Sequence, residues 1–353
     1  MEDSTKVAAL TLLAQVLCPD GGPDHDFAPL HTKVSTRRLA DLIDSALNMA
    51  MDNKVLIPAY DRLYALFGRT YLAGHEKNYE TLMHRWECME KVLRDSLDAA
   101  STIGVDPVVI KTIRTFPYVG SDIDLLVASE DEYRNLKRGL GAKGYVPLAE
   151  DLKSATMEKS LSGGSVLVDL HNSVLYAGGV PYLKEIWRYK IERQTGGLHF
   201  SALIPEAELV LLAAHSAFKE FNISFADFVY ALQLIQQLKS LDKAYVIANG
   251  EGAVLGLNIF FETVRALSVR LGCLSFSIPV QKGLIAGKII ARIRSDINSS
   301  FSMPYVYPIA VPVSIYLDKL FSKPYDCFKG VSVLVNKYGL THMYKYIKSS
   351  ARL

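Results

Sequence analysis

Two aspartates, one residue apart, stand at the start of an apolar run, residues 121–127 (SDIDLLV). Side chains alternate between the two faces of a β-strand, so Asp122 and Asp124 are predicted to lie side by side. Neighbouring carboxylates resist joint ionisation unless a cation lies between them. Mg²⁺ takes oxygen ligands and is commonly held by one or two carboxylates together with substrate phosphates. The spacing therefore predicts a site for Mg²⁺, or for Mn²⁺, on this strand.

A third carboxylate lies in a second strand-like run, residues 166–171 (VLVDLH). Asp169 follows Asp124 by 45 residues and is again set among apolar neighbours. Three acids on strands fit a two-metal site, in which the ions bind the attacking and the leaving oxygens of a phosphoryl transfer. A D-x-D pair before a strand also occurs in solvated turns and helix caps. The combination of Asp122, Asp124 and Asp169 favours the metal site over that alternative.

The composition indicates a globular protein. The chain has 353 residues, of which 50% are hydrophobic and 22% charged, enough for two or three modest domains. The net charge of +2 says little about partners, but residues 282–353 hold 11 Lys or Arg against 3 Asp or Glu. This basic segment fits contact with a polyanion or, equally, a solvated lysine-rich face. No P-loop and no GxGxxG motif occurs, which excludes these two kinds of nucleotide site.

The cysteines and the apolar runs predict a cytoplasmic protein without a membrane partner. The four cysteines form no C-x-x-C pair and no zinc-like spacing with histidine, which argues against a structural zinc site and a disulfide scaffold. No basic segment precedes the first apolar stretch, so no signal peptide is expected. The longest uncharged apolar run, residues 305–317, has 13 residues and two prolines and is too short to cross a bilayer.

The apolar periodicity predicts the elements that would position the aspartates. Helices are expected at 7–17, 36–51, 78–97, 206–221, 224–238, 254–271 and 282–297. Between them, strands are expected at 107–113 and 123–127, a helix at 129–140, and a hairpin of 152–161 with 166–170. We therefore predict a mostly helical α+β fold. A small mixed sheet would form a core domain, 105–200, between helical regions 1–104 and 201–353.

The runs SDIDLLV and VDLH (168–171) resemble those of the polymerase-beta-like nucleotidyltransferase superfamily, especially the branch of uncharacterised nucleotidyltransferases. Members carry Gly-Ser, then 9 to 13 residues, then D-x-D on a strand, with a third acid on a later strand. The resemblance covers about residues 85–240, including the helical stretch 203–238 with His215 and Asp227. It implies a sheet-based nucleotidyltransferase core with a divalent cation.

The first half of the motif departs from this pattern. Gly120-Ser121 adjoins Asp122 without a spacer, whereas Lys111-Thr112 is followed by nine residues and then Asp122, at the place of Gly-Ser. The resemblance implies nucleotide contacts from this stretch, and the candidates are Lys111, Thr112, Arg114 and Ser121. Glycine lets backbone amides approach a phosphate more closely than lysine does. A catalytically degenerate protein that binds nucleotide or RNA therefore stays an alternative.

By resemblance, the reaction would move a nucleoside monophosphate from an NTP to an acceptor hydroxyl and release pyrophosphate. Asp122 and Asp124 would hold the metals that bridge the triphosphate, and Asp169 would ligate the second metal and act on the attacking hydroxyl. The acceptor would be an RNA 3′ end (a tRNA, for example), a protein side chain or a small molecule, and the basic segment favours RNA. A phosphohydrolase that uses the same acids with water as nucleophile is a further alternative.

Several other residues admit both a structural and a functional interpretation. His171 is expected to be a half-buried histidine with its hydrogen bonds satisfied, though it shares a strand face with Asp169. His215 and Asp227 are expected to make a structural hydrogen bond between two helices. Tyr182, Trp187 and Tyr189 would serve packing rather than base stacking.

Overall fold

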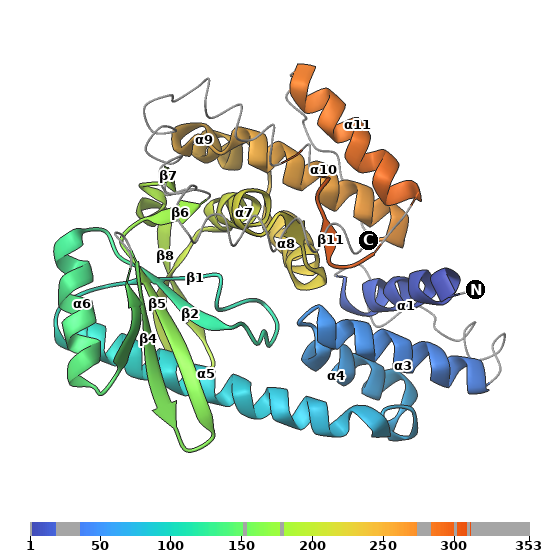
Figure 1. Cartoon of the computed structure of the whole chain (residues 1–353), viewed down its shortest axis with the longest axis horizontal. Coiled ribbons are helices and arrows are strands. Elements are labelled where there is room, and N and C mark those ends of the chain that lie inside the picture. Colours follow the sequence, from blue (N-terminus) through green and yellow to red (C-terminus); the bar gives the residue numbers. More distant parts are fainter. Residues whose placement is uncertain are drawn as a thin grey trace.

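The computed structural model describes residues 2–18, 36–150, 154–176, 180–273, 284–299, 302–308 and 311. It is mostly helical, with a seven-stranded mixed sheet between N-terminal and C-terminal helices (Figure 1). This confirms the predicted mostly helical α+β fold. No helix of the described ranges is long and apolar enough to cross a membrane. Most of the basic segment 282–353 lies outside the described residues.

The N-terminal region consists of helices that lead into the sheet. Its elements are α1 (Glu2–Leu17), α3 (Thr36–Asp52), α4 (Leu56–Phe67), two short 3₁₀ turns (Arg69–Tyr71 and Ala73–His75) and α5 (Glu76–Thr102). Helix α5, of 27 residues, runs from the neighbourhood of α4 to the sheet, where it lies beneath the strands (Figure 1). It thereby connects the N-terminal helices to the element that carries the aspartates. Helix α4 was not predicted from the sequence.

The strand order of the sheet is β3-β4-β5-β2-β1-β9-β8. The bounds are β1 (Val108–Ile110), β2 (Asp122–Leu126), β3 (Val146–Glu150), β4 (Ser154–Leu161), β5 (Gly164–His171), β8 (Lys190–Thr195) and β9 (Leu198–Leu203). Strand β2 pairs in parallel with β5, and β1 in parallel with β9; the other pairs are antiparallel. The expected hairpin is present as β4 and β5, whereas β3, β8 and β9 were not predicted.

One face of the sheet packs against α5 and α6 (Glu130–Ala142), which Figure 1 shows beside the strands. Helix α6 begins where the sequence predicts, because the Ser129 side chain accepts a hydrogen bond from the Glu132 backbone N–H and satisfies one of the first free amides. The odd-numbered residues Ile123 and Leu125 of β2 are buried in this cluster. The alternation of a strand therefore sends Asp122 and Asp124 to the opposite face.

The opposite face meets the C-terminal helices. These are α7 (Pro205–Ala214), α8 (Phe225–Gln237), α9 (Asp242–Glu251), α10 (Val254–Leu271) and α11 (Leu284–Ser299). Two small pairs of strands accompany them: β6 (Val174–Tyr176) with β7 (Val180–Leu183), and β10 (Asn222–Ile223) with β11 (Tyr305–Val306). The helix predicted at 206–221 is α7 followed by one π-helical turn, His215–Glu220. A π-turn inserts an extra residue per turn and often marks a functional position.

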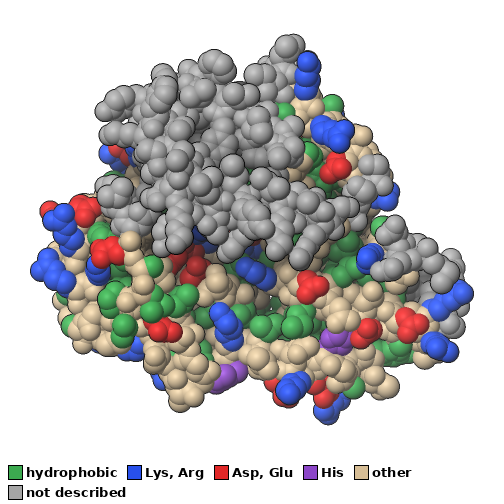
Figure 2. Space-filling model, in the orientation of Figure 1, with side chains coloured by type: hydrophobic (Ala, Val, Ile, Leu, Met, Phe, Trp, Pro, Cys, Tyr) green, Lys and Arg blue, Asp and Glu red, His purple; other side chains and the backbone are tan. Residues whose placement is uncertain are grey.

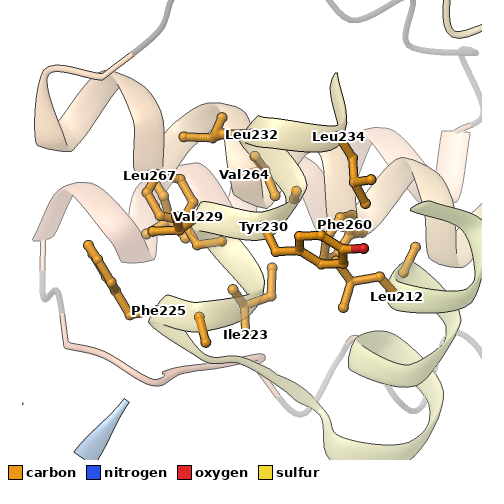
Figure 3. Packing of buried hydrophobic residues seen from close by; sticks show 14 of the residues in the cluster. Leu212, Ile223, Phe225, Val229, Tyr230, Leu232, Leu234, Phe260, Val264 and Leu267 are labelled. Carbon is orange, nitrogen blue, oxygen red and sulfur yellow. The ribbon is translucent and has the colours of Figure 1, made fainter. Parts of the chain in front are cut away.

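The largest buried cluster joins residues of α1, α3 and α4 to residues of the C-terminal helices. Figure 3 shows its centre, where aromatic and aliphatic side chains from α7, α8 and α10 interdigitate, among them Leu212, Tyr230 and Phe260. Val108, Ile110 and Leu126 of the sheet belong to the same cluster. The carboxylate-bearing face of β2 is thus enclosed between the sheet and these helices. The domain boundaries at 104 and 200 stay a prediction.

Candidate active site

Four neighbouring strands place a row of side chains across the sheet. In the register of the strands, Asp124 of β2 lies between Ile110 of β1 and Asp169 of β5. Thr156 of β4 lies on the far side of Asp169. Residues in register on adjacent strands project to the same face, so the two aspartates stand next to each other. The sheet therefore brings together acids that are 45 residues apart in the sequence.

Asp124 is buried and is bound by two basic side chains. Its Oδ1 accepts a hydrogen bond from His171 Nε2 at 2.9 Å and lies 2.7 Å from Lys111 Nζ. Its backbone N–H donates to Thr112 Oγ1 at 2.9 Å. Burial alone would raise the pKa of Asp124, but the Lys111 ammonium and the His171 imidazole outweigh it and hold that pKa well below its usual value. Asp124 is therefore ionised at neutral pH.

The two other carboxylates have different surroundings. Burial and the nearby charges of Asp124 and Asp169 raise the pKa of Asp122, while Lys111 opposes this effect. Asp169 accepts a hydrogen bond from Thr156 Oγ1 at 2.6 Å. Asp124, Asp169 and His171 each offer a ligand atom within 4.8 Å of the others. Mutually repelling carboxylates with an imidazole beside them are a donor set that fits a divalent cation.

Lys111 follows β1 directly and has a backbone φ of 57°. This left-handed conformation favours glycine, the residue that the resemblance expects at this position. Its side chain is 15% exposed. Burial acts to lower the pKa of the ammonium, but the carboxylates of Asp124, Asp122 and Asp169 prevail and raise it. The structure places this cation on the aspartates, where the sequence predicted contact with phosphates.

Thr112 is also buried, and its hydroxyl links two strands. Its Oγ1 donates to the Ile110 carbonyl at 3.1 Å and accepts the Asp124 backbone N–H. The hydroxyl that was predicted to meet a phosphate is therefore engaged with backbone. Ser121, by contrast, is exposed directly before β2, beside the Arg85 guanidinium, which lies 3.5 Å from the Ser121 carbonyl.

Arg114 lies in the same loop and is buried against α8. Its Nη2 lies 2.7 Å from Asp227 Oδ1, and its guanidinium is stacked 3.7 Å from the centre of the Tyr118 ring. Asp227 also completes a capping box with Ser224 at the start of α8. The ion pair thus ties the loop between β1 and β2 to the C-terminal helices. The prediction of a phosphate contact for Arg114 stays untested.

His215 lies close enough to this site to interact electrostatically with Lys111 and Asp124, whereas the sequence predicted only a structural role for it. Burial and the positive charges of Lys111 and Lys219 lower the pKa of His215 well below its usual value, although Asp227 and Asp124 act in the opposite direction. Its Nε2 lies 3.5 Å from Glu220 Oε1. Asp227, the expected partner of His215, is paired with Arg114. The π-turn places His215 here, and sequence periodicity gives no signal for such a turn.

The aromatic candidates are placed by packing. Trp187 and Tyr189 lie in a 3₁₀ turn, Ile186–Tyr189, and are partly buried against the large cluster. The side chain of Tyr182 lies outside the described residues.

Comparison with known proteins finds a match for the part of the chain that carries the three aspartates, on β2 and β5, and the helices α7 and α8. Residues 119–261 match a family model described as uncharacterised nucleotidyltransferase. The match spans β2 to the middle of α10 and includes Asp122, Asp124 and Asp169. No curated protein and no solved structure matches the chain. Residues 119–261 of this chain are therefore similar to the uncharacterised nucleotidyltransferase family, in agreement with the resemblance carried by SDIDLLV and VDLH.

Proposed function

We propose that the protein transfers a nucleoside monophosphate from an NTP to an acceptor hydroxyl and releases pyrophosphate. The observation that carries the proposal is the position of Asp122, Asp124 and Asp169 on the parallel strands β2 and β5, inside the family match. The buried setting of Asp124 strengthens electrostatic interactions with phosphate-bound cations.

A divalent cation, Mg²⁺ or Mn²⁺, is part of this proposal. Asp122, Asp124 and Asp169 would hold it, because their carboxylates face the same side of the sheet and Asp124 stays ionised. When bound, the ion neutralises charge on the triphosphate and lowers the pKa of an attacking hydroxyl. Thr156 fixes the Asp169 carboxylate, which is the group proposed to take the proton of that hydroxyl.

The residues of the loop between β1 and β2 would bind the nucleotide. The Lys111 ammonium is proposed to contact phosphate oxygens from its position beside Asp124. The exposed Ser121 hydroxyl, directly before β2, is proposed to contact the nucleotide from the solvent side. Thr112 and Arg114 are buried against protein atoms, so they are proposed to act on the nucleotide through the shape of this loop.

The acceptor is proposed to be an RNA 3′ end. The support is the basic composition of residues 282–353, of which α11 exposes Lys288 and Arg292. Over the described part of the face in Figure 2, basic and acidic side chains are interspersed. An RNA acceptor would give binding that weakens steeply with salt, because phosphate contacts release counterions.

The first experiment is transfer of label from each α-labelled NTP, with Mg²⁺ or Mn²⁺ and total RNA, by the wild type and by Asp122→Asn. Asp122 is repelled by its acidic neighbours, so removal of its charge is expected to preserve the fold while lowering transfer about 100-fold or more. Asp131→Ala, an exposed acid on α6, is the matched control and should behave like the wild type. Equal transfer by Asp122→Asn and the wild type would contradict the proposal.

A specific observation supports the degenerate alternative, because lysine replaces glycine at residue 111 and its ammonium lies on Asp124. That alternative predicts nucleotide or RNA binding without pyrophosphate release under either metal. The phosphohydrolase alternative predicts a labelled nucleoside monophosphate in the absence of any acceptor.

A further inference from the structure

The two contacts of the Asp124 carboxylate with described side chains fall on the same oxygen. Lys111 Nζ and His171 Nε2 both meet Oδ1, at 2.7 Å and 2.9 Å. A carboxylate that bridges two metal ions uses both of its oxygens, and the ions of such pairs stand about 3.5–4 Å apart. With Oδ1 engaged by an ammonium and an imidazole, Asp124 has only Oδ2 to offer to a metal ion.

The position of the Lys111 ammonium is set by the fold. The residue follows β1 in a left-handed conformation, and the next residue, Thr112, bonds the Asp124 backbone. The side chain is largely enclosed, and three carboxylates favour its charged form. If the largely buried ammonium moved away from these carboxylates, its positive charge would have no nearby negative charge to balance it, and this costs free energy. Lys111 is therefore a built-in cation of the site.

We propose that this site takes a single divalent ion and that the Lys111 ammonium occupies the place of a second one. One divalent ion and one ammonium balance the three negative charges of Asp122, Asp124 and Asp169 before the triphosphate binds. This inference rests on the proposed function and replaces the two-metal site that the sequence predicted. Asp122, Asp169 and Oδ2 of Asp124 would hold the divalent ion, and the Lys111 ammonium, held on Oδ1, would supply the second positive charge of the site.

The test counts bound ions rather than turnover. Mn²⁺ binding is measured by electron paramagnetic resonance, with an ATP analogue whose α–β bridge is a methylene group. The wild type is expected to bind one Mn²⁺ per chain in the site, and Lys111→Met, which keeps the length of the side chain without its charge, is expected to bind two. Lys137→Met is the matched control, because Lys137 pairs with Glu150 on the edge of the sheet and should leave the count at one.

Two Mn²⁺ ions in the wild type, or none, would overturn the inference, whatever Lys111→Met does. Circular dichroism shows whether Lys111→Met folds. If it does not, Lys111→Arg still tests the role of the positive charge, because it keeps a cation and is expected to bind one ion. One Mn²⁺ ion without transfer to any acceptor would sink the proposed function and leave this inference standing. Two bound Mn²⁺ ions together with active transfer would overturn this inference and leave the proposed function standing.

A separate observation concerns the sulfur atoms of Cys18 and Cys273, which lie 3.1 Å apart. Cys18 directly follows α1, and Cys273 directly follows the C-cap glycine of α10. They are 255 residues apart in the sequence. Close approach of two thiols at helix ends that pack in one cluster removes the main obstacle to a disulfide, which is the positioning of the two sulfurs.

We infer that this pair forms a reversible disulfide in exchange with a small-molecule disulfide such as glutathione disulfide. One thiolate attacks the oxidant and releases one reduced thiol; the second thiolate then attacks the mixed disulfide and releases the other. Two protein thiols are thereby oxidised and one small disulfide is reduced to two thiols. The bond would join α1 to the end of α10.

Mass spectrometry of the unreduced protein after treatment with glutathione disulfide tests this inference. The expected result is a peptide pair joined through Cys18 and Cys273, with a higher melting temperature than that of the reduced protein. Cys18→Ser should abolish both changes, and Cys88→Ser should keep them. A stable mixed disulfide with glutathione, or a bond mapped to another pair such as Cys88 or Cys327, would overturn it.

Discussion

At the scale of single residues, the charges around His215 decide its protonation. Lys111 and Lys219 oppose a further positive charge there, and burial acts in the same direction, while Asp227 and Asp124 only partly compensate. Glu220 also lies beside the ring. In the folded protein, His215 therefore stays neutral at a pH where a solvated histidine takes up a proton.

This environment predicts a pH dependence of stability. Because the folded pKa of His215 is lowered, the unfolded chain binds a proton below about pH 6.5 that the native protein does not. Stability is thus fully present above that pH and falls as the pH decreases, by up to about 1.4 kcal/mol per pH unit. Urea unfolding of metal-free protein between about pH 7 and 5 measures the slope. His215→Gln should flatten it, and equal slopes would contradict the prediction.

At the scale of elements, the ion pair of Arg114 with Asp227 anchors the loop between β1 and β2 to α8. Arg114 and Asp227 are both enclosed, with side chains 4% and 16% exposed. The capping box of Ser224 and Asp227 fixes the start of α8. Loss of the guanidinium would leave a buried carboxylate without its counter-charge and would release the loop that carries Lys111.

We expect Arg114→Ala to lower the free energy of unfolding by about 3–5 kcal/mol. Arg114→Lys should recover only part of this, since an ammonium cannot stack on the Tyr118 ring as a planar guanidinium does. Urea unfolding measures both variants. Arg69→Ala is the control, because Arg69 pairs with Glu76 at the surface and its removal should have no measurable effect. A similarly small effect at Arg114 would refute the anchoring role.

Helix α10 packs against the π-turn at a glycine. A Cβ atom on Gly256 would lie 2.7 Å from the Phe218 ring, and Phe218 is buried. Gly256→Ala should therefore destabilise the protein by about 1–3 kcal/mol despite the better helix propensity of alanine. Gly250→Ala in α9 is the matched control, since its Cβ would meet nothing within 4 Å, and it should be neutral or stabilising. The midpoint of urea unfolding distinguishes the two; equal midpoints would argue against close packing at Gly256.

At the scale of the whole molecule, the N-terminal and C-terminal helices share one buried cluster. Helices α1 and α10 are in contact, as are α10 and α11. Glu262 of α10 is fully buried, and its Oε2 lies 2.7 Å from Nη2 of Arg294 in α11. Helix α5 then carries the chain from this body to the sheet (Figure 1). Parts of the chain far apart in sequence therefore depend on each other for burial.

A shared core predicts cooperative unfolding. The only two tryptophans, Trp86 of α5 and Trp187 near the C-terminal helices, report on different parts of the structure. Their fluorescence, followed separately in Trp86→Phe and Trp187→Phe variants, should change at the same urea concentration. Leu47→Ala in α3, where Leu47 is fully buried, should shift both transitions by the same amount and cost about 2–5 kcal/mol. Two separate transitions would indicate independent domains.

The sequence by itself determined the strands that carry the acids and the resemblance to nucleotidyltransferases. The alternation in SDIDLLV and VDLH is a local property, since the backbone of a strand fixes which side chains share a face. The same holds for Ser129 as a helix cap and for the apolar stripes of α3 and α8, whose positions were predicted. The family match at residues 119–261 confirms the resemblance that these local patterns carried.

The tertiary structure decided which groups meet at Asp124. Lys111 and Thr112 reach it from the loop after β1, and His171 reaches it from β5. No local periodicity encodes how these strands pair. Strand β8 is too weakly patterned to be predicted, because exposed polar residues dominate it. The π-turn at His215 breaks the helical period. The pairing of the strands, the balance of charges at Asp124 and the π-turn all depend on contacts with distant parts of the chain. Such contacts are a property of the fold as a whole.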